Sequence, residues 1–409
     1  MSVYALPASV QWPINRRNVP LWAMFDRIKD VGHPDEEMLS VYREHGVIKK
    51  SSRDDNTNQT AENRNIYQLI DEGWFVVNRM KAWQGSVGIS SLRGIVSGHY
   101  ICFRPRHGED PRYLNWLLRS GIYALEYARM SRGVRPGQIE IDNDELHGLR
   151  IALPPHDEQR RIADFLDAET SQIDQMRYLQ TSVLEKLDQR DRAVRDGLVD
   201  RLVGQIGELP LRRYASKIEQ GSSPSCENYP RVSGEWGVLK LSAVKGGRFY
   251  PEENKQLPDS IEPVRQYEVR EGDLLISRAN TPELVGDVAV VKDIAGRLLL
   301  PDLIYRVGLG KAIKAEFAAQ VFLSTRIRGL IQATARGSSQ SMVKLRGEDI
   351  REWPIPRANA QQQDTFVSAI TDQLESSARL RAAVHRQLAL LSERRQALVT
   401  AAVTGGISV

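Results

Sequence analysis

Apolar side chains recur at every seventh position along two long and otherwise charged stretches of the chain. The first row consists of Leu166, Ile173, Gln180, Leu187 and Val194, and the second consists of Ile370, Ser377, Val384, Leu391 and Leu398. A seven-residue apolar row on a charged helix needs a partner helix of the same kind. We therefore predict that the two helices pack together through Leu166, Ile173, Leu187, Val194, Ile370, Val384, Leu391 and Leu398.

One polar residue interrupts each apolar row, Gln180 in the first and Ser377 in the second. A polar residue in such a row can fix the register of a helix pair. The alternative is that both side chains are tolerated near solvent. The sequence leaves both interpretations open.

Runs rich in β-branched and aromatic residues precede each helical stretch. They lie at residues 73–80 and 99–105 in the first half and at residues 272–278, 286–293 and 303–309 in the second half. These runs predict strands. A helix is expected after them in each half, over residues 111–131 and 314–335, followed by a loop containing glycine and a short strand that ends in proline. The pattern predicts an α+β protein in which each half is a globular α/β domain with a helical tail.

The order of elements in the first half recurs in the second half after 204 residues, the separation of Arg132 from Arg336. The same shift pairs Tyr113 with Phe317 and Gln159 with Gln363. We infer a pseudo-two-fold internal repeat. It predicts two similar domains over residues 1–155 and 205–357, a first spacer helix over residues 156–204, and a second spacer helix with the C-terminal tail over residues 358–409.

A two-fold relation between the halves would set the spacer helices antiparallel. The first helix would carry the chain away from one domain, and the second would carry it back from the other. The two domains are then expected at opposite ends of a rod. With about 40 residues per helix at about 1.5 Å each, the rod would be on the order of 60 Å long.

Composition is ordinary for a soluble globular protein, and its basic residues are mostly arginine. Of the 56 basic residues 43 are arginine, and the formal net charge is +4. Arginine suits phosphates and guanine edges, although genome bias would give the same composition. No apolar run approaches the roughly 18 residues that span a bilayer, and the N-terminus lacks a secretory signal, so we expect a cytoplasmic protein with no membrane partner. Cys102 and Cys226 form neither a disulfide framework nor a zinc-ligand set.

The sequence contains no pattern that predicts catalysis. A phosphate-binding GxxxxGK[ST] loop is absent, and residues 228–231, Asn-Tyr-Pro-Arg, only mimic the tetrapeptide of amino-group DNA methyltransferases. The triplet Glu253-Asn254-Lys255, which would suit a metal-dependent nuclease, lies in a polar turn with no Pro-Asp ahead of it, and no Ser/His/Asp set can be argued. We expect no catalytic residue, no metal site and no cofactor on this chain.

Basic and amide side chains cluster in predicted loops of both halves, where a rigid frame commonly presents recognition groups. Such side chains hold phosphates or pair with base edges in the major groove. For any one of them a solvated surface charge is the simpler interpretation, but as a group they favour double-stranded DNA. The expected contacts are Arg79, Lys81, Arg132, Arg135, Gln138, Lys245, Arg248, Arg278, Arg336, Lys344 and Arg346.

Residues 151–174, IALPPHDEQRRIADFLDAETSQID, resemble the junction between a target recognition domain and the conserved helix in specificity subunits of type I restriction-modification systems. That pattern is an aliphatic-proline strand, then Glu-Gln, then a helix with Ile, Leu and Asp at fixed steps. Residues 353–370 and the ending LVTAAVTGGISV resemble the second junction and the C-terminus of the family, with Gln361 to Gln363 in place of Glu-Gln. The resemblance covers the whole chain.

The resemblance implies a non-enzymatic subunit that reads an asymmetric bipartite DNA site, with one domain for each half-site. It also implies two methyltransferase subunits as partners, which bind S-adenosylmethionine and methylate adenine, and restriction subunits that use ATP and Mg²⁺. Glu158, Gln159 and the charged helix faces are then expected partner surfaces. Two alternatives remain open: a nuclease or methyltransferase that acts alone, and a coiled-coil scaffold that binds no nucleic acid.

Overall fold

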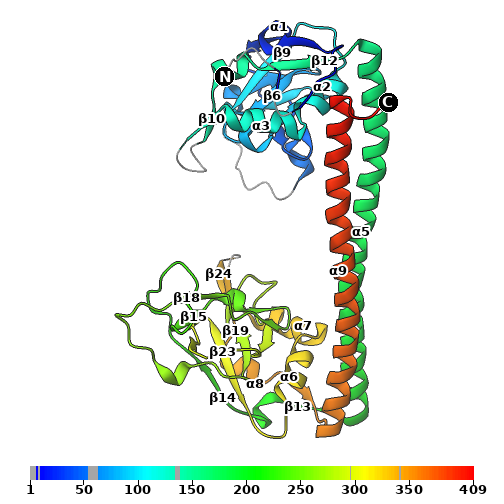
Figure 1. Cartoon of the computed structure of the whole chain (residues 1–409). Coiled ribbons are helices and arrows are strands. Elements are labelled where there is room, and N and C mark those ends of the chain that lie inside the picture. Colours follow the sequence, from blue (N-terminus) through cyan, green and yellow to red (C-terminus); the bar gives the residue numbers. More distant parts are fainter. Residues whose placement is uncertain (1–5, 8–9, 54–62, 134–138, 295, 340–341) are drawn as a thin grey trace. The chain divides into compact units, whose positions relative to one another are not determined.

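The computed structural model describes residues 6–7, 10–53, 63–133, 139–294, 296–339 and 342–409, and it divides the chain into two compact units (Figure 1). Unit 1 comprises Met1–Gln180 and His385–Val409, and unit 2 comprises Thr181–Val384. Two long helices, α5 (His156–Ile206) and α9 (Ala360–Thr404), contribute a segment to each unit. None of the helices among the described residues is both long and apolar enough to cross a bilayer.

Each unit also contains a mixed part outside the long helices, which we call its lobe. The lobe of unit 1 is built on an antiparallel sheet in the order β2 (Phe25–Ile28), β9 (Tyr100–Pro105), β6 (Phe75–Asn78) and β7 (Val87–Ile89). Smaller antiparallel pairs join β1 (Arg17–Pro20) to β12 (Arg150–Leu153), β3 (Leu39–Tyr42) to β4 (Gly46–Lys49), β5 (Gln68–Ile70) to β8 (Gly94–Val96), and β10 (Ser131–Arg132) to β11 (Glu140–Ile141).

The central sheet of unit 1 is covered on both faces, which explains the continuous apolar run in β6. Phe75 and Val77 belong to one buried cluster, whereas Val76 belongs to another together with Cys102. A strand that is covered on both faces is apolar at successive positions instead of alternating with polar ones.

The lobe of unit 2 has a central antiparallel sheet with the corresponding strand order, β14 (Ala215–Gln220), β23 (Ile304–Leu309), β19 (Leu274–Ser277) and β21 (Val288–Val290). Two three-stranded sheets lie around it, one in the order β18 (Asn254–Gln256), β15 (Gly237–Leu239) and β22 (Leu298–Leu299), and one in the order β20 (Ala279–Asn280), β25 (Met342–Lys344) and β24 (Arg336–Ser339). Two strand pairs complete the lobe: β16 (Val244–Lys245) pairs with β17 (Arg248–Phe249), and β13 (Glu208–Pro210) pairs with β26 (Pro354–Pro356). The predicted strands and the α+β class are confirmed.

The single helix predicted after the strands of each half is wrong, because two helices occur there in each unit. Unit 1 has α2 (Pro111–Leu118) and α3 (Gly121–Arg129), and unit 2 has α6 (Ala315–Phe322) and α7 (Thr325–Thr334). Ser120 and Ser324 separate them with extended backbone, at ψ 156° and 152°. Serine competes for local backbone hydrogen bonds, and the Ser324 hydroxyl donates to the carbonyl of Val321 at 2.6 Å. The short helices are α1 (Leu21–Met24), α4 (Asn143–His147) and α8 (Gly347–Arg351).

A fully buried glutamine joins the start of each long helix to its lobe. Gln159 Oε1 accepts from the amide of Asp110, and its Nε2 donates to Pro154 O and Glu109. Gln363 Oε1 accepts from the amide of Lys314, and its Nε2 donates to Ala312 O and Ala358 O. Both side chains are 0% exposed, so the expectation that Gln159 forms part of a partner surface is wrong. Each glutamine satisfies backbone groups that burial would otherwise leave unpaired.

The helix segments of unit 1 contact each other and the lobe. Leu166 and Ile173 on α5 are buried, while Leu391 and Leu398 on α9 are half-buried. Two ion pairs link the helices in this unit, Glu169 with Arg394 at 3.8 Å and Asp174 with Arg395 at 3.5 Å. Because Leu166 and the end of α9 share the core of the lobe, the compact unit does not stop at residue 155, where the sequence placed the end of the first domain.

In unit 2 the apolar contacts between the helices surround a buried polar cluster. Leu187, Ile370 and Val384 are buried, and Val194 is half-buried. Ser377 is 0% exposed, and its hydroxyl donates to Asp191 Oδ1 at 2.6 Å. The near-solvent interpretation of Ser377 is therefore wrong, whereas Gln180 in unit 1 is only half-buried.

Asp191 is the acceptor at the centre of this polar cluster. Gln373 Nε2 donates to its Oδ1 at 3.1 Å, and Arg381 donates to its Oδ2 at 2.7 Å. Burial alone would raise the pKa of Asp191, but the hydrogen bonds from Ser377, Arg381 and Gln373 outweigh it and lower the pKa below the ordinary value. The carboxylate therefore stays ionised at neutral pH and fixes one alignment of α5 against α9 within unit 2.

The two cysteines of the chain differ in exposure. Cys102 on β9 is buried, and burial raises the pKa of its thiol to about 12. Cys226 is half-buried and precedes β15, with its Sγ 3.4 Å from the carbonyl of Pro224. Burial also raises the pKa of the Cys226 thiol.

Ser377→Ala is expected to lower the free energy of unfolding of unit 2 by about 1.5–3 kcal/mol, because it removes a hydrogen bond to a buried carboxylate. Hydrogen exchange of the α9 amides within unit 2, measured at increasing urea concentrations, reports the decrease in this free energy. Ser368→Ala on the exposed face of the same helix is the matched control and should change stability by no more than about 0.5 kcal/mol. Equal effects of the two substitutions would contradict the role of the cluster.

Candidate nucleic-acid interface

In unit 1, backbone pairing brings together Arg79 and Arg132, two of the residues expected to contact DNA. Arg79 follows β6, and its carbonyl accepts from the amide of Ile141 in β11 at 3.1 Å. Arg132 lies in β10 opposite Glu140 of β11. The end of a central strand and a short hairpin therefore meet at one exposed site.

Each of these arginines is held by a carboxylate. Arg79 Nε lies 2.9 Å from Glu140 Oε2, and Arg132 forms an ion pair with Glu145. The side chains of Arg79 and Arg132 are 45% and 70% exposed. Exposed ion pairs contribute only about 0–1 kcal/mol, so a phosphate or a base edge can displace the carboxylate at little cost.

Lys81 lies near this site in the chain and is exposed. The Asn78 side chain accepts from the amides of Met80 and Lys81, both at 3.1 Å, and so fixes the turn that follows β6. A one-turn 3₁₀ segment, Ala82–Gln84, begins directly after Lys81. The other two candidates of this half, Arg135 and Gln138, lie outside the described residues.

Unit 2 joins the corresponding backbone positions. Arg278 follows β19, and its carbonyl accepts from the amide of Leu345 at 2.9 Å. Lys344 of β25 lies opposite both Ala279 of β20 and Arg336 of β24. Arg346 begins α8, where its amide donates to Asp349 Oδ2 at 3.2 Å. In both units a basic candidate thus follows the corresponding strand of the central sheet, Arg79 after β6 and Arg278 after β19, and a second one lies in a short strand beside it, Arg132 in β10 and Arg336 in β24.

Arg278 differs from Arg79 in how its side chain is used. Its Nε donates to the Tyr305 hydroxyl at 3.1 Å and its Nη1 donates to Asp302 O at 3.2 Å, with the guanidinium 5.8 Å from the Tyr305 ring centre. A half-buried guanidinium bonded in this way is fixed in direction. Arg278 therefore orients the neighbouring loop and has fewer N–H groups left for a ligand.

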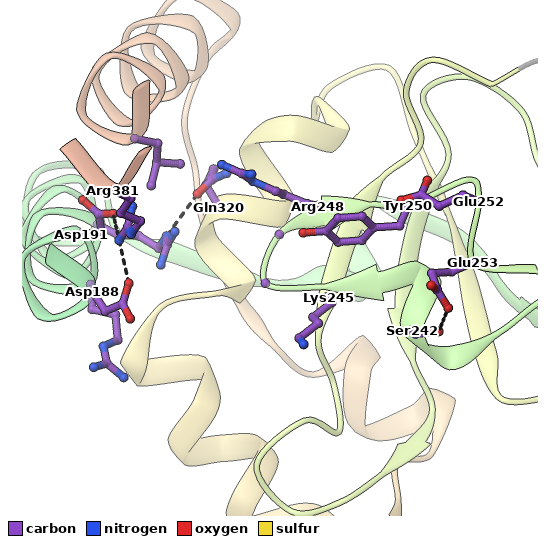
Figure 2. A pocket seen from close by; sticks show the side chains of 15 residues that line it. Asp188, Asp191, Ser242, Lys245, Arg248, Tyr250, Glu252, Glu253, Gln320 and Arg381 are labelled. Carbon is purple, nitrogen blue, oxygen red and sulfur yellow. Dashed lines mark hydrogen bonds and ion pairs between the residues drawn. The ribbon is translucent and has the colours of Figure 1, made fainter. Parts of the chain in front are cut away.

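Lys245 and Arg248 lie apart from the other candidates, on the hairpin formed by β16 and β17. Gly246 and Gly247 form its tight turn at φ values of +59° and +80°, which glycine adopts without strain. Asp287 Oδ2 accepts from the amide of Gly246 at 2.7 Å and holds this turn against the sheet. The hairpin forms one wall of a cleft whose opposite wall includes Asp188 and Asp191 of α5 and Arg381 of α9 (Figure 2).

Sequence reasoning missed several residues of this arrangement. Asp287 lies inside a predicted strand, and Arg195 lies on a helix whose charged face was interpreted as a partner surface. Gln320 lies in α6, far from either in the chain, and accepts from Arg195 Nε at 3.1 Å. Nothing in their spacing indicated the cleft, because Arg195 and Gln320 meet only through tertiary packing, and Asp287 acts on it through the turn of the β16–β17 hairpin.

Asp287→Asn is expected to make the stability of unit 2 less dependent on pH. Burial raises the pKa of Asp287, so its contribution to stability is fully present below the ordinary aspartate pKa of about 3.9 and is lost as the pH rises through the raised value. Relative to the wild type, the variant should therefore gain stability from about pH 4 toward pH 7. Urea unfolding across this range measures the trend, with the exposed Asp259→Asn as the control. A difference between variant and wild type that is independent of pH would contradict it.

Comparison with known proteins gives similarities to one class of protein. Residues 27–185 match the family model described as type I restriction modification DNA specificity domain. Over 197 residues the chain is 32% identical to the type I restriction enzyme EcoEI specificity subunit of Escherichia coli, covering 46% of this chain and 32% of that protein. Over 304 residues it is 22% identical to the EcoKI specificity subunit of Escherichia coli strain K12, covering 71% of this chain and 64% of that protein. The matches thus span less than two thirds of either relative.

A solved structure has a similar fold over nearly the whole chain. It is described as "Structural basis underlying complex assembly and conformational transition of the type I R-M system". The alignment covers 97% of this chain and 100% of the other at a TM-score of 0.67 and 16% sequence identity. At this identity the likeness concerns the fold alone.

Proposed function

We propose that this chain, a type I restriction-modification specificity subunit by its DNA specificity domain and relatives, reads an asymmetric bipartite DNA target. The observation that carries the proposal is the repeated placement of basic residues. Arg79 with Arg132 in unit 1, and Arg278 with Arg336 in unit 2, occupy corresponding places beside the central sheet. Two such sites with different surrounding residues suit two different half-sites.

The proposed contacts divide between positioning and reading. Exposed Lys81, Lys344 and Arg346 are placed to hold phosphates, which sets the register of the protein on the duplex. Arg79 and Arg132 form exposed ion pairs with carboxylates and can exchange these for guanine edges. Arg336 is assigned with them from its place in β24.

In this proposal, α5 and α9 act as an antiparallel coiled-coil spacer between two target recognition domains. The contacts within each unit support it, since earlier residues of α5 pair with later residues of α9. Asp174 pairs with Arg395 in unit 1, and Asp191 pairs with Arg381 in unit 2. A helix of 51 residues is about 75 Å long at about 1.5 Å per residue, which would set a fixed separation between half-sites.

Exposed apolar side chains on the helix segments support docking of methyltransferase subunits. In unit 1, Met176, Tyr178 and Leu179 on α5 and Leu390 on α9 are each roughly half exposed or more, with Tyr178 at 74%. Large apolar groups gathered on a helix surface mark an interaction site. We assign this surface to two methyltransferase subunits, with restriction subunits joining the assembly. The chain itself binds the DNA target, and its partner subunits carry out the catalytic steps.

The complex of this chain with its methyltransferase subunit is expected to protect two short DNA segments separated by a fixed gap. DNase footprinting on DNA that carries the methylated site tests this, because each unit contacts one segment and the helices hold them apart. One continuous footprint on a single palindrome would contradict the bipartite assignment. A footprint that disappears when only one segment is mutated would still agree with it.

Arg132→Ala and Arg336→Ala in that complex are each expected to weaken DNA binding through a different half-site. A lost phosphate contact reduces the magnitude of the negative slope of log K against log salt concentration by about 0.9. A lost base contact instead reduces the binding free energy by about 1–3 kcal/mol at one base pair. Fluorescence anisotropy across salt concentrations separates the two cases. Arg129→Ala, which removes an exposed arginine paired with Glu126 on α3, is the matched control. If Arg132→Ala and Arg129→Ala bind equally well, the assignment of Arg132 is wrong.

A further inference from the structure

The cleft between the β16–β17 hairpin and the helix segments of unit 2 has a volume of about 780 Å³. Figure 2 shows Asp188, Asp191 and Arg381 on the helix side, with Lys245, Arg248 and Tyr250 on the side of the lobe. Gln320 of α6 lies between them. All of these residues belong to unit 2. The DNA contacts proposed above do not use this cleft.

Arg195 is a largely enclosed cation in the wall of the cleft. Its Nε donates to the neutral amide oxygen of Gln320 at 3.1 Å, and it forms no ion pair with any carboxylate of the described residues. Burial lowers the pKa of Arg195 even though Asp196 and Asp191 act to raise it. Burial of a guanidinium that no carboxylate contacts directly is costly, so an incoming anion that bonds to it would be favoured.

Three further cations line the cleft, and the described residues provide them with no ion pair. Arg192 comes from α5, whereas Lys245 and Arg248 flank the turn of the β16–β17 hairpin, and all three are exposed. The hairpin is held in place because Asp287 accepts from the amide of Gly246. The cations therefore come from two elements that are fixed independently of any ligand.

The carboxylates that line the cleft determine whether a polyanion or a single acidic group can bind there. Asp188 and Asp191 are occupied by Arg381, and Glu253 accepts from the Ser242 hydroxyl at 2.5 Å. Glu252 is exposed at the rim. A nucleic-acid strand carries a charge at every phosphate and would meet these carboxylates repeatedly. A single acidic side chain on an otherwise neutral or mixed-charge protein segment would meet only the cations.

We propose that the cleft docks a segment of a partner protein through one aspartate or glutamate, which enters between Arg195 and Arg248. Arg192 lies at the same wall to guide the acidic group, and Leu374 and Tyr250 provide apolar contact for the rest of the segment. The inference rests on the proposed function in one respect, since the partner is the methyltransferase subunit. Lys245 and Arg248, which the sequence assigned to DNA, contact protein in this interpretation.

Unit 1 offers no equivalent acceptor for such a segment at the matching sequence position. The residue 204 positions before Gln320 is Trp116, whose Nε1 donates to Asp167 at 2.8 Å. The Arg395 guanidinium lies over the Trp116 ring, 5.4 Å from its centre, and also pairs with Asp174. The guanidinium beside Trp116 in unit 1 thus already has an aromatic face and a carboxylate as neighbours. The docking contact is specific to unit 2.

The test uses the full chain in complex with its methyltransferase subunit on DNA, with a benzophenone amino acid at Tyr250. Irradiation is expected to give an adduct with a methyltransferase peptide that contains an acidic residue. Arg248→Glu and Arg192→Glu should each weaken methyltransferase binding about tenfold or more at low salt, because each replaces an attraction with a repulsion. The exposed Arg265→Glu makes the same charge change elsewhere in unit 2 and should leave binding unchanged. An acid-to-arginine substitution in the captured peptide should restore binding to Arg248→Glu.

Three results would overturn the cleft assignment while leaving the proposed function intact. They are an adduct with DNA in place of protein, a loss of DNA affinity without loss of methyltransferase binding, and equal binding by wild type, Arg248→Glu and Arg192→Glu. A wild-type chain that binds neither the methyltransferase subunit nor DNA would overturn the proposed function itself. Arg192 and Arg248 are exposed, so their variants are expected to fold, and hydrogen exchange of β19 checks this.

Discussion

The rest of the structure depends on the attachment of each long helix to the core of its own lobe. Gln159 and Gln363 make that attachment polar and specific, because each bonds backbone groups of the preceding strand exit and of the helix that follows the central sheet. Leu166 and Ile370 make it apolar, since each belongs to the main buried cluster of its unit. A helix attached in this way cannot rotate against its lobe without exposing both kinds of contact. Recognition residues on the lobe therefore keep a fixed direction relative to the helix axis within each unit.

Sequence patterns predicted the elements that depend on periodicity and burial. The residues of the two seven-residue rows are all buried or half-buried on α5 and α9, and the apolar runs coincide with β6, β9, β19, β21 and β23. The resemblance to type I specificity subunits is confirmed by the family match and the relatives. The breaks at Ser120 and Ser324 were missed because apolar residues continue on both sides of each serine, and only the backbone turns.

The sequence predicted the candidate site only where residues expected in loops are also brought together by pairing of neighbouring strands. Arg79 and Arg132 were recognised as loop residues, and strand pairing with β11 brings them together. Arg278 was grouped with them by sequence, but its bonds to Tyr305 and Asp302 come from a strand and a loop that no spacing rule connects to it. The cleft was not predicted at all, since its cations come from a helix and a hairpin about fifty residues apart in the chain.

The unequal burial of the two thiols has a practical consequence for observing this protein in solution. Cys102 is buried in unit 1, and the pKa of its thiol is raised to about 12, so a maleimide reagent should not label it at neutral pH. Cys226 remains partly accessible in unit 2. The native chain thus carries a single attachment point for a fluorophore. Emission from that dye would report on unit 2 alone, without any engineered residue.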